Sequence, residues 1–317
     1  MSFYVPRPGD ILSHDIADYP EGIVLPVDKP YRWTSADVIR KLKWKAIRHF
    51  GKKNLKVGHA GTLDPLATGI LLVCIGDACK KAQMLQDHDK EYIAGIRFGA
   101  TTPSYDLEKD VDRRFPCEHI TADAVRNALP AFLGEQEQVA PLFSAKSVDG
   151  VRAYELARKL YRTGRTDELD ATALDSLQRN KINISELELL GFEEAEEALS
   201  PEPMAALGRV RGRGPLPAGQ WEGWRGEAPE GSGESASSAS SRINVTDTSG
   251  LGLPEVSVRI ACSKGTYIRA FARDLGEALG SGAHLSALIR SRSGDFAIKD
   301  ALSLEDALGL FDQAQSL

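Results

Sequence analysis

Cysteines are few in this sequence, and none lies in a pattern that suggests a shared bond. The four are Cys74, Cys79, Cys117 and Cys262, with no CxxC pair and no histidine at a zinc-ligand spacing. Cys74 and Cys262 lie within apolar, strand-like runs, where a thiol packs as a small hydrophobic group. The sequence therefore favours neither a disulfide framework nor a metal site.

Long apolar runs are also missing. The N-terminal segment MSFYVPRPGDILSHD has no basic start followed by an apolar core, so it does not indicate a signal peptide. No apolar run reaches the roughly 20 residues that a membrane-spanning helix needs. With 42% hydrophobic and 26% charged residues, the composition is typical of globular proteins. These features predict a cytoplasmic protein without a membrane segment.

Acidic residues are absent from one stretch, Val38 to Leu63, although the chain carries a formal net charge of −6. We call its eight lysine and arginine residues the basic cluster: Arg40, Lys41, Lys43, Lys45, Arg48, Lys52, Lys53 and Lys56. Apolar positions from Val38 to Phe50 recur with a helical period, and Thr34 or Ser35 can cap the start of this helix. The basic cluster is either a solvated surface or a surface that faces phosphates.

Apolar periodicity predicts further elements along the chain. Strands are expected at 23–28, 70–75, 90–98, 181–190 and 256–262. Helices are expected at 77–86, from Thr121 to Leu133, after a turn at Asp149-Gly150, and after Lys264-Gly265 with Thr266 as the N-cap. Strands and helices are mixed without regular strand–helix–strand alternation, which indicates an α+β domain.

Residues 191–254 depart from this pattern. The part at 200–242 is rich in Gly, Pro, Ser and Ala and poor in branched apolar side chains. Such a composition buries too little surface to offset chain entropy, so this part is predicted to be largely disordered. Arg209, Arg211 and Arg213 resemble a short RNA-binding RGG tract. The alternative, which we favour, is an unstructured surface insertion.

The most informative segment is GHAGTLDPLATG, at 58–69. Three glycines within it permit tight turns and close approach of a ligand to the backbone. Pro65 biases Asp64 away from helical geometry, so the carboxylate is held on an extended or turn backbone. The spacing alone leaves two interpretations open: Asp64 caps a turn, or Asp64 takes part in a reaction.

This segment resembles the signature of the bacterial tRNA pseudouridine-55 synthase family of the TruB type. Other blocks agree with that family in the same order. They are VDKP (27–30) with Thr34-Ser35, KEY (90–92), VAPLFSAK (139–146) with GVRAYELAR (150–158), CSKGTYIR (262–269), AHL (283–285) and RSRSGDF (290–296). The resemblance covers 23–190 and 255–300.

The resemblance implies a pseudouridine synthase fold, in which a mixed, largely antiparallel sheet and flanking helices surround a central active-site cleft. The catalytic domain would comprise 23–190 and 255–300, after an N-terminal extension at 1–22. Residues 191–254 would be an insertion. The tail at 301–317 is too short for the PUA RNA-binding domain that many relatives carry, so this domain is expected to be absent.

The resemblance also implies roles for individual residues. Asp64 would attack a flipped-out uridine at position 55 of the T loop, Tyr92 would stack on its base, and Arg269 would pair with Asp64. The residues expected to contact RNA or line its pocket are His59, Tyr267, Lys29, Lys264, Gly61 and Thr62. Isomerisation of uridine involves no redox change, so neither a metal nor another cofactor is expected.

The expected partner is tRNA, bound through its T arm by a monomer that needs no protein partner and no membrane. Arg32 departs from the family pattern, because the family has a glycine two residues after its Lys-Pro pair. Either Arg32 strains a backbone of positive φ, or it adds a positive side chain near the RNA. The segment GATTPSYDLEKD, at 99–110, also lacks the usual glycine after its acids.

Three other functions compete with this interpretation. A guide-RNA-dependent pseudouridine synthase shares the Gly-Thr-Leu-Asp-Pro core, whereas residues 66–69 and the expected lack of a PUA domain favour the stand-alone type. A non-catalytic tRNA-folding chaperone would not need Asp64, Tyr92 and Arg269 together. A glycosidase would need a second acid in a carboxylate pair, and the sequence offers no obvious one.

Overall fold

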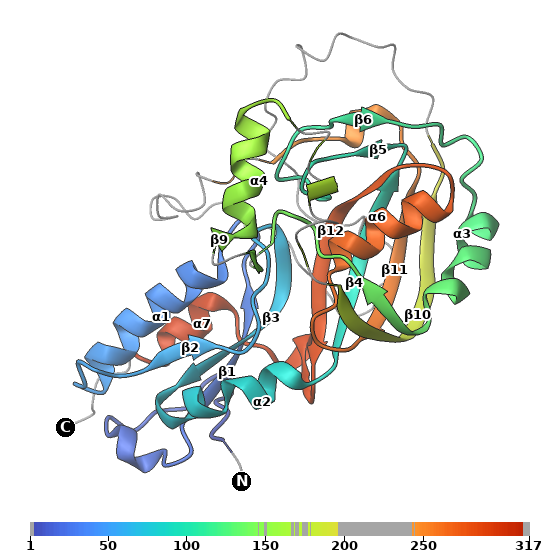
Figure 1. The fold of residues 1–317 in the computed structure, drawn as a ribbon. Helices are drawn as coiled ribbons and strands as arrows, with labels where there is room; N and C mark the ends of the chain where they lie inside the picture. The colour runs from blue at the N-terminus through green and yellow to red at the C-terminus, as the bar shows by residue number, and fades with distance from the viewer. Residues whose placement is uncertain are drawn as a thin grey trace. The chain divides into compact units, whose positions relative to one another are not determined.

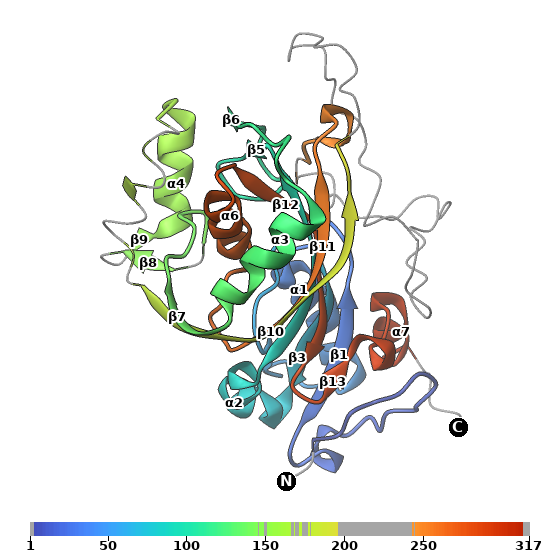
Figure 2. The ribbon, with the colours of Figure 1, turned by 90° about the vertical axis from the view of Figure 1, so that its right-hand side faces the viewer.

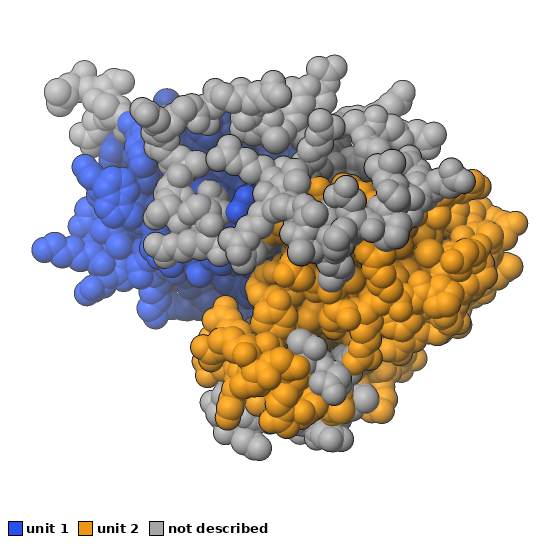
Figure 3. All heavy atoms as spheres, turned by 90° about the horizontal axis from the view of Figure 1, so that it is seen from above, with its two compact units in different colours: residues 1–92, 218–243, 289–317 blue, residues 93–217, 244–288 orange. Residues whose placement is uncertain are grey.

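The computed structural model describes residues 3–144, 146–148, 151–165, 168, 171–172, 177, 179–195, 243 and 245–312. The turn predicted at Asp149-Gly150 and the stretch at 200–242 lie outside the described residues. The chain forms two compact units, coloured blue and orange in Figure 3. Unit 1 comprises Met1–Tyr92, Ala218–Ile243 and Ile289–Leu317, and unit 2 comprises Ile93–Pro217 and Asn244–Leu288.

β1 (Ile23–Lys29) and β3 (Ala67–Ile75) confirm the strands predicted at 23–28 and 70–75. The two strands pair antiparallel, from Ile23 opposite Ile75 to Lys29 opposite Gly69. The short β2 (Val57–His59) also pairs with β3, and β12 (Ala283–Ser293) is the next strand after β3 in the sheet. Figure 1 shows β1, β2 and β3 in blue. Buried side chains of β1, β3 and α2 (Ala82–Asp87) build one core of this unit.

Helix α1 (Ser35–His49) in unit 1 contacts β2 and a second helix, α7 (Leu304–Gly309), which contacts β1. α1 begins at Thr34, whose side chain accepts from the Asp37 amide at 3.0 Å, while the Asp37 carboxylate accepts from the Thr34 amide at 3.2 Å. This capping box confirms the predicted helix start. Val38, Leu42 and Ala46 face the core, and most of the basic cluster is exposed. α7 packs against both α1 and β1 (Figure 1).

The strands of unit 2 follow the order β12-β4-β11-β10-β7. β4 (Lys90–Phe98) and β12 each run through both units, and β11 (Glu255–Cys262), β10 (Asn180–Glu193) and β7 (Gly134–Gln138) pair antiparallel (Figure 2). The β10–β11 register shifts between Ile184 and Glu186 and between Leu189 and Gly191. Bulges of this kind explain the imperfect alternation in the sequence. Two small pairs, β5 (Ala100–Thr101) with β6 (Arg113–Arg114) and β8 (Ser147–Val148) with β9 (Val151–Arg152), complete the unit.

Unit 2 contains the helices α3 (Ala122–Ala128), α4 (Ala153–Arg162) and α6 (Ile268–Ala278). α3 begins at Thr121, as predicted, and a 3₁₀ turn, Leu129–Phe132, follows it. The rings of Phe132 and Phe271 meet edge to face at 5.4 Å, which ties this turn to α6. The described residues thus form a mixed α+β fold with a mostly antiparallel sheet, as the sequence predicted.

One helix start was predicted wrongly. Thr266 does not cap α6, since its hydroxyl donates to the Ser263 carbonyl at 2.9 Å. The helix begins after Tyr267, whose amide donates to the Gln138 side chain at 2.8 Å. A distant glutamine therefore takes the place of a local cap.

The four cysteines are free thiols. The helices that the structure describes are too short or too polar to cross a bilayer. The same described residues contain no group of three potential metal ligands.

Candidate active site

Asp64 lies in the connection between β2 and β3, at a turn closed by the Ala67 amide, which donates to the Asp64 carbonyl at 3.1 Å. Gly61 and Gly69 flank the turn with φ of +98° and +94°, values that favour glycine. A Cβ on Gly69 would lie 2.3 Å from the backbone oxygen of Arg290, so no side chain fits there. The expected glycine-bounded turn that carries the carboxylate is therefore present.

Arg290, on β12, is buried beneath this turn with only 1% of its surface exposed. Its Nε donates to the Ile70 carbonyl at 2.7 Å, its Nη2 to that of Gly61 at 3.1 Å, and its Nη1 to that of Thr62 at 3.4 Å. The guanidinium carries five donors in a planar fork, so one side chain can hold carbonyls from both sides of the turn. Arg290 thereby fixes the segment in which Asp64 lies.

Two further buried side chains hold the immediate neighbours of Asp64. The Ser35 hydroxyl donates to the Leu63 carbonyl at 3.1 Å and accepts from the Leu63 amide at 2.9 Å. Lys29 Nζ donates to the Pro65 carbonyl at 3.2 Å and to two carbonyls of the segment after β1. Burial lowers the pKa of Lys29 to about 7, although the negative charge of Asp64 opposes this shift. Buried side chains thus hold the residues on both sides of Asp64 in place.

The other predicted residues of unit 1 lie close to these in the sequence. His59 ends β2 and is partly buried; burial, together with the charge of Arg290, lowers the pKa of His59. Its imidazole is therefore neutral near pH 7. Thr62 is exposed, and Tyr92 is buried in β4 with 9% of its surface exposed. Unit 1 holds six of the predicted site residues: Lys29, His59, Gly61, Thr62, Asp64 and Tyr92.

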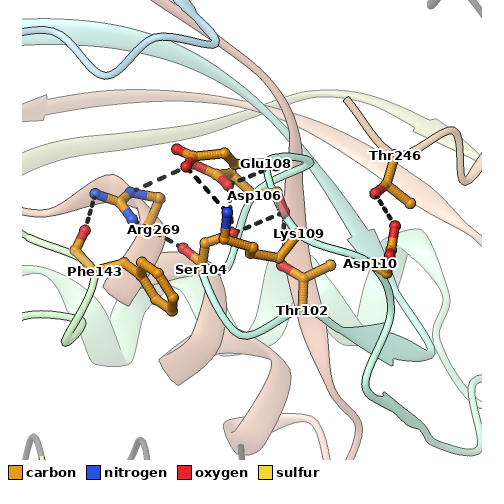
Figure 4. A network of polar contacts seen from close by, with 9 residues as sticks. All are labelled: Thr102, Ser104, Asp106, Glu108, Lys109, Asp110, Phe143, Thr246 and Arg269. Carbon is orange, nitrogen blue, oxygen red and sulfur yellow. Dashed lines mark hydrogen bonds and ion pairs between the residues drawn. The ribbon is translucent and has the colours of Figure 1, made fainter. Parts of the chain in front are cut away.

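Arg269 lies in the first turn of α6, in unit 2, and is 5% exposed. Its Nη1 donates to the Ser104 carbonyl at 3.0 Å and its Nη2 to the Phe143 carbonyl at 2.9 Å. Its Nε lies 3.8 Å from a carboxylate oxygen of Asp106 (Figure 4). Asp64 and Arg269 belong to different units, so their pairing stays a prediction.

Asp106 is a buried carboxylate that the sequence analysis did not assign to the site. Its Oδ1 accepts from the Ser104 hydroxyl at 2.6 Å and from the Glu108 amide at 2.9 Å. Its own carbonyl accepts from the Thr102 hydroxyl at 2.6 Å (Figure 4). The loop is therefore shaped around one carboxylate that faces Arg269. The available signal was the run of Thr, Ser and Asp at 101–106.

Tyr267 and Lys264 precede α6. Both main-chain groups of Tyr267 bond to Gln138, whose Oε1 accepts from the amide at 2.8 Å and whose Nε2 donates to the carbonyl at 3.2 Å. The Tyr267 ring packs against the core that includes Val139 and Phe143, while Lys264 is exposed. Gln138 was also missed, since nothing in the sequence of β7 singles it out. Lys264, Tyr267 and Arg269 are the predicted site residues in unit 2.

Arg32 has a left-handed backbone conformation, which favours glycine. Its φ is +62°, one of two positive values among the described non-glycine residues. Its Nη2 donates to the carbonyl of Ile243 at 2.7 Å. The strain that the sequence suggested at this position is therefore present.

Sequence comparison identifies relatives along most of the chain. The family model described as TruB family pseudouridylate synthase (N terminal domain) matches residues 48–200, and the model for the tRNA pseudouridylate synthase B C-terminal domain matches residues 269–315. A tRNA pseudouridine synthase B from Phocaeicola vulgatus is 42% identical over 298 residues, which cover 94% of this chain and 97% of the relative. The protein of the same name from Deinococcus radiodurans is 35% identical over 283 residues, covering 89% and 77%.

The fold also occurs among solved structures. A chain in the crystal structure of a Cbf5-Nop10-Gar1 complex superimposes with a TM-score of 0.51 at 22% identity. The match covers 93% of this chain and 56% of that chain, so this chain spans about half the length of the solved one. At this identity the likeness shows a shared fold and no more.

Proposed function

This chain belongs to the TruB family of pseudouridylate synthases and is an isomerase, and we propose that it converts uridine 55 in the T loop of tRNA to pseudouridine with Asp64 as the nucleophile. One observation carries the proposal. Buried side chains bond to both neighbours of Asp64, at Leu63 and Pro65, and to both ends of its turn, where Arg290 binds the carbonyls before and after it. A loop held this firmly suits a group that must meet a reacting atom in one geometry.

The reaction breaks the bond between C1′ of the ribose and N1 of uracil, and it joins C1′ to C5 of the same base. The C5 proton leaves and N1 gains a proton, so no electrons are exchanged. A carboxylate supplies a nucleophile that forms and later releases a covalent adduct. In this proposal Asp64 is that nucleophile, and Arg269 holds it ionised by pairing with it.

The target base lies inside a folded RNA loop and must be flipped out before it can react. Aromatic side chains stack on such bases, and we assign this role to Tyr92, with Tyr267 lining the pocket. His59, Gly61, Thr62 and Lys264 contact the RNA around the target in this assignment. Lys29 supports this surface from the protein interior, because its Nζ donates to the Pro65 carbonyl.

The basic cluster supplies the charge for general RNA binding. Its lysines and arginines follow α1 and the segment before β2 without an acidic residue among them. Each phosphate that they neutralise releases a counterion, so binding of tRNA weakens as salt rises.

The decisive test is conversion of tRNA by the purified protein, followed by mass spectrometry of T-loop fragments. We expect pseudouridine at position 55, and a tRNA with cytidine at that position should give no product. Asp64→Asn keeps the shape of the side chain but removes the nucleophile, so turnover should fall at least about 10³-fold while tRNA affinity changes only a few fold. Asp77→Asn, which changes an exposed carboxylate of the same unit, is the matched control. Substantial turnover by Asp64→Asn contradicts the assignment.

A further inference from the structure

Unit 1 contains a hollow between the C-terminal half of α1 and the residues after α7. Its volume is about 320 Å³, and it is lined by residues of α1, the N-terminal segment and the end of the described chain. We call it the α1 pocket. None of its lining residues belongs to the turn at 58–69 or to the predicted catalytic set.

Trp44 is the most conspicuous side chain of the α1 pocket. It lies in the middle of α1 and is 56% exposed, whereas Val38 and Leu42 on the same helix are fully buried and its two isoleucines are partly buried. The guanidinium of Arg48 lies 4.6 Å from the centre of the indole ring, and Lys45 Nζ lies 5.9 Å from it. The core of unit 1 does not require an aromatic ring here. An exposed indole with cations beside it suits stacking of a nucleic-acid base whose phosphate pairs with a cation.

The floor of the α1 pocket is also aromatic. The rings of His14 and His49 stack at 4.2 Å, and Phe311 meets His49 edge to face at 5.6 Å. His14 Nδ1 bonds to the His49 carbonyl and His49 Nε2 to the Ser13 carbonyl, both at 3.1 Å. These contacts hold the floor in place without a ligand, so binding there costs little ordering of side chains.

Charge in and around the α1 pocket favours a ligand that combines a neutral ring with a phosphate. Asp312 is the single acidic residue among the described lining residues, and it already pairs with Lys45. The C-terminal end of a helix carries a partial negative charge, which disfavours a bare anion deep in the hollow. A base stacked at the ring with its phosphate at the exposed tip of Arg48 avoids this repulsion. A nucleotide within an RNA strand has that layout.

We propose that the α1 pocket binds a nucleotide of the substrate RNA, with the base on Trp44 and its phosphate at Arg48. The proposal deepens the proposed function, and it rests on that function only in taking tRNA as the RNA. The site adds affinity and register, and it leaves the reaction at Asp64 unchanged.

The first test follows the fluorescence of Trp44 alone, in a protein with Trp33, Trp221 and Trp224 changed to Phe. A stacked base quenches an indole, so saturating tRNA should quench Trp44, with saturation established separately by filter binding. Fluorescence unchanged at saturation overturns the proposal. This readout does not depend on turnover, so it distinguishes failure of the pocket from failure of the proposed enzyme activity.

The second test compares tRNA dissociation constants at matched salt. Trp44→Ala should raise the dissociation constant roughly tenfold, in line with the loss of one stacked base. Trp44→Phe should restore most of the affinity, and Arg48→Ala should weaken binding more than Lys43→Ala. Lys43→Ala is the matched control, because it removes one exposed charge from the same helix outside the pocket lining.

Equal effects of Arg48→Ala and Lys43→Ala, with Trp44→Ala within twofold of the wild type, would show an ordinary charged surface and overturn the proposal. If the wild type itself formed no pseudouridine, the result would instead contradict the proposed function. Because Trp44 is exposed, its variants should fold normally, which circular dichroism can verify.

Discussion

In unit 1 the buried guanidinium of Arg290 holds a turn in place, whereas in unit 2 two loops hold the buried guanidinium of Arg269. Both cations donate to backbone carbonyls, three at Arg290 and two at Arg269. The difference lies in the nearest acid. Arg269 has the carboxylate of Asp106 at 3.8 Å, while the bonds of Arg290 described above all go to carbonyls.

This contrast indicates opposite roles for the same chemical group. A guanidinium that binds carbonyls across a turn has a structural role, because it fixes the turn that carries the functional group. A guanidinium that is itself fixed by carbonyls and a carboxylate is held ready for a further partner, which we propose to be Asp64. Replacing each arginine by lysine keeps the charge but removes the planar fork, so the same change should give different losses at the two positions.

The largest effect is expected at Arg269. Arg269→Lys should lower the single-turnover rate roughly 100-fold, corresponding to about 3 kcal/mol in the transition state, because a point charge cannot hold a carboxylate in one orientation. Arg273→Lys, one turn further along α6, is the control; this side chain binds the Val139 carbonyl and Asp274. A near-normal rate for Arg269→Lys would show that its fork does not orient the nucleophile.

A change in stability is the second expected effect. Arg290→Lys should lower the free energy of unfolding by about 3 kcal/mol, since two of the three carbonyls that Arg290 binds lose their donor at about 1–3 kcal/mol each. Turnover per folded molecule should fall less than for Arg269→Lys. Urea denaturation measures the loss, with Arg292→Lys on the same strand as the control. If Arg290→Lys lost turnover without losing stability, the contrast between the two arginines would be wrong.

The sequence located the elements of the fold better than the contacts that hold the site. Periodicity identified β1, β3, β4 and β11, and Thr34 and Thr121 were recognised as caps because each acts on residues three positions away. These signals are local. The resemblance also placed Asp64 in a glycine-bounded turn, which the structure contains.

Long-range bonds left no comparable trace in the sequence. Arg290 and Arg292 look alike in the sequence, yet only Arg290 is fully buried, and its partners lie more than two hundred positions earlier in the chain. Gln138 replaced the expected cap at Thr266 for the same reason, since it reaches Tyr267 from a strand far away in sequence. A pattern within a window of a dozen residues contains no information about such pairs.

Lys29 offers a smaller test of the scaffold in unit 1. Its pKa is lowered to about 7 in the folded protein, against about 10.4 in an unfolded chain. Between these values the unfolded chain binds a proton that the folded protein does not, so raising the pH stabilises the fold. Between pH 7 and pH 8.5 the free energy of unfolding of the wild type should rise by about 1.5 kcal/mol more than that of Lys29→Met. Urea denaturation at both pH values measures the difference. Identical pH slopes would mean that Lys29 keeps its proton throughout this range.

The smallest effect is expected at Arg32, which binds a carbonyl, as both buried arginines do, but on a strained backbone. Its φ of +62° costs a non-glycine residue about 1–2 kcal/mol. Its bond to the Ile243 carbonyl stabilises the fold by about 1 kcal/mol. Arg32→Ala keeps the strain and loses the bond, so it should be less stable than the wild type by about 1 kcal/mol.

Arg32→Gly loses the same bond but also relieves the strain. Part of this gain is lost, because glycine has greater conformational freedom in the unfolded chain, which lowers stability. The free energy of unfolding of the glycine variant should therefore be about 1 kcal/mol higher than that of the alanine variant and close to that of the wild type. Thermal denaturation of the three proteins side by side measures both differences. If alanine and glycine gave equal stability, the strain relieved at Arg32 would be no larger than the entropic cost of glycine, and loss of the hydrogen bond to Ile243 would account for the cost of replacing this arginine.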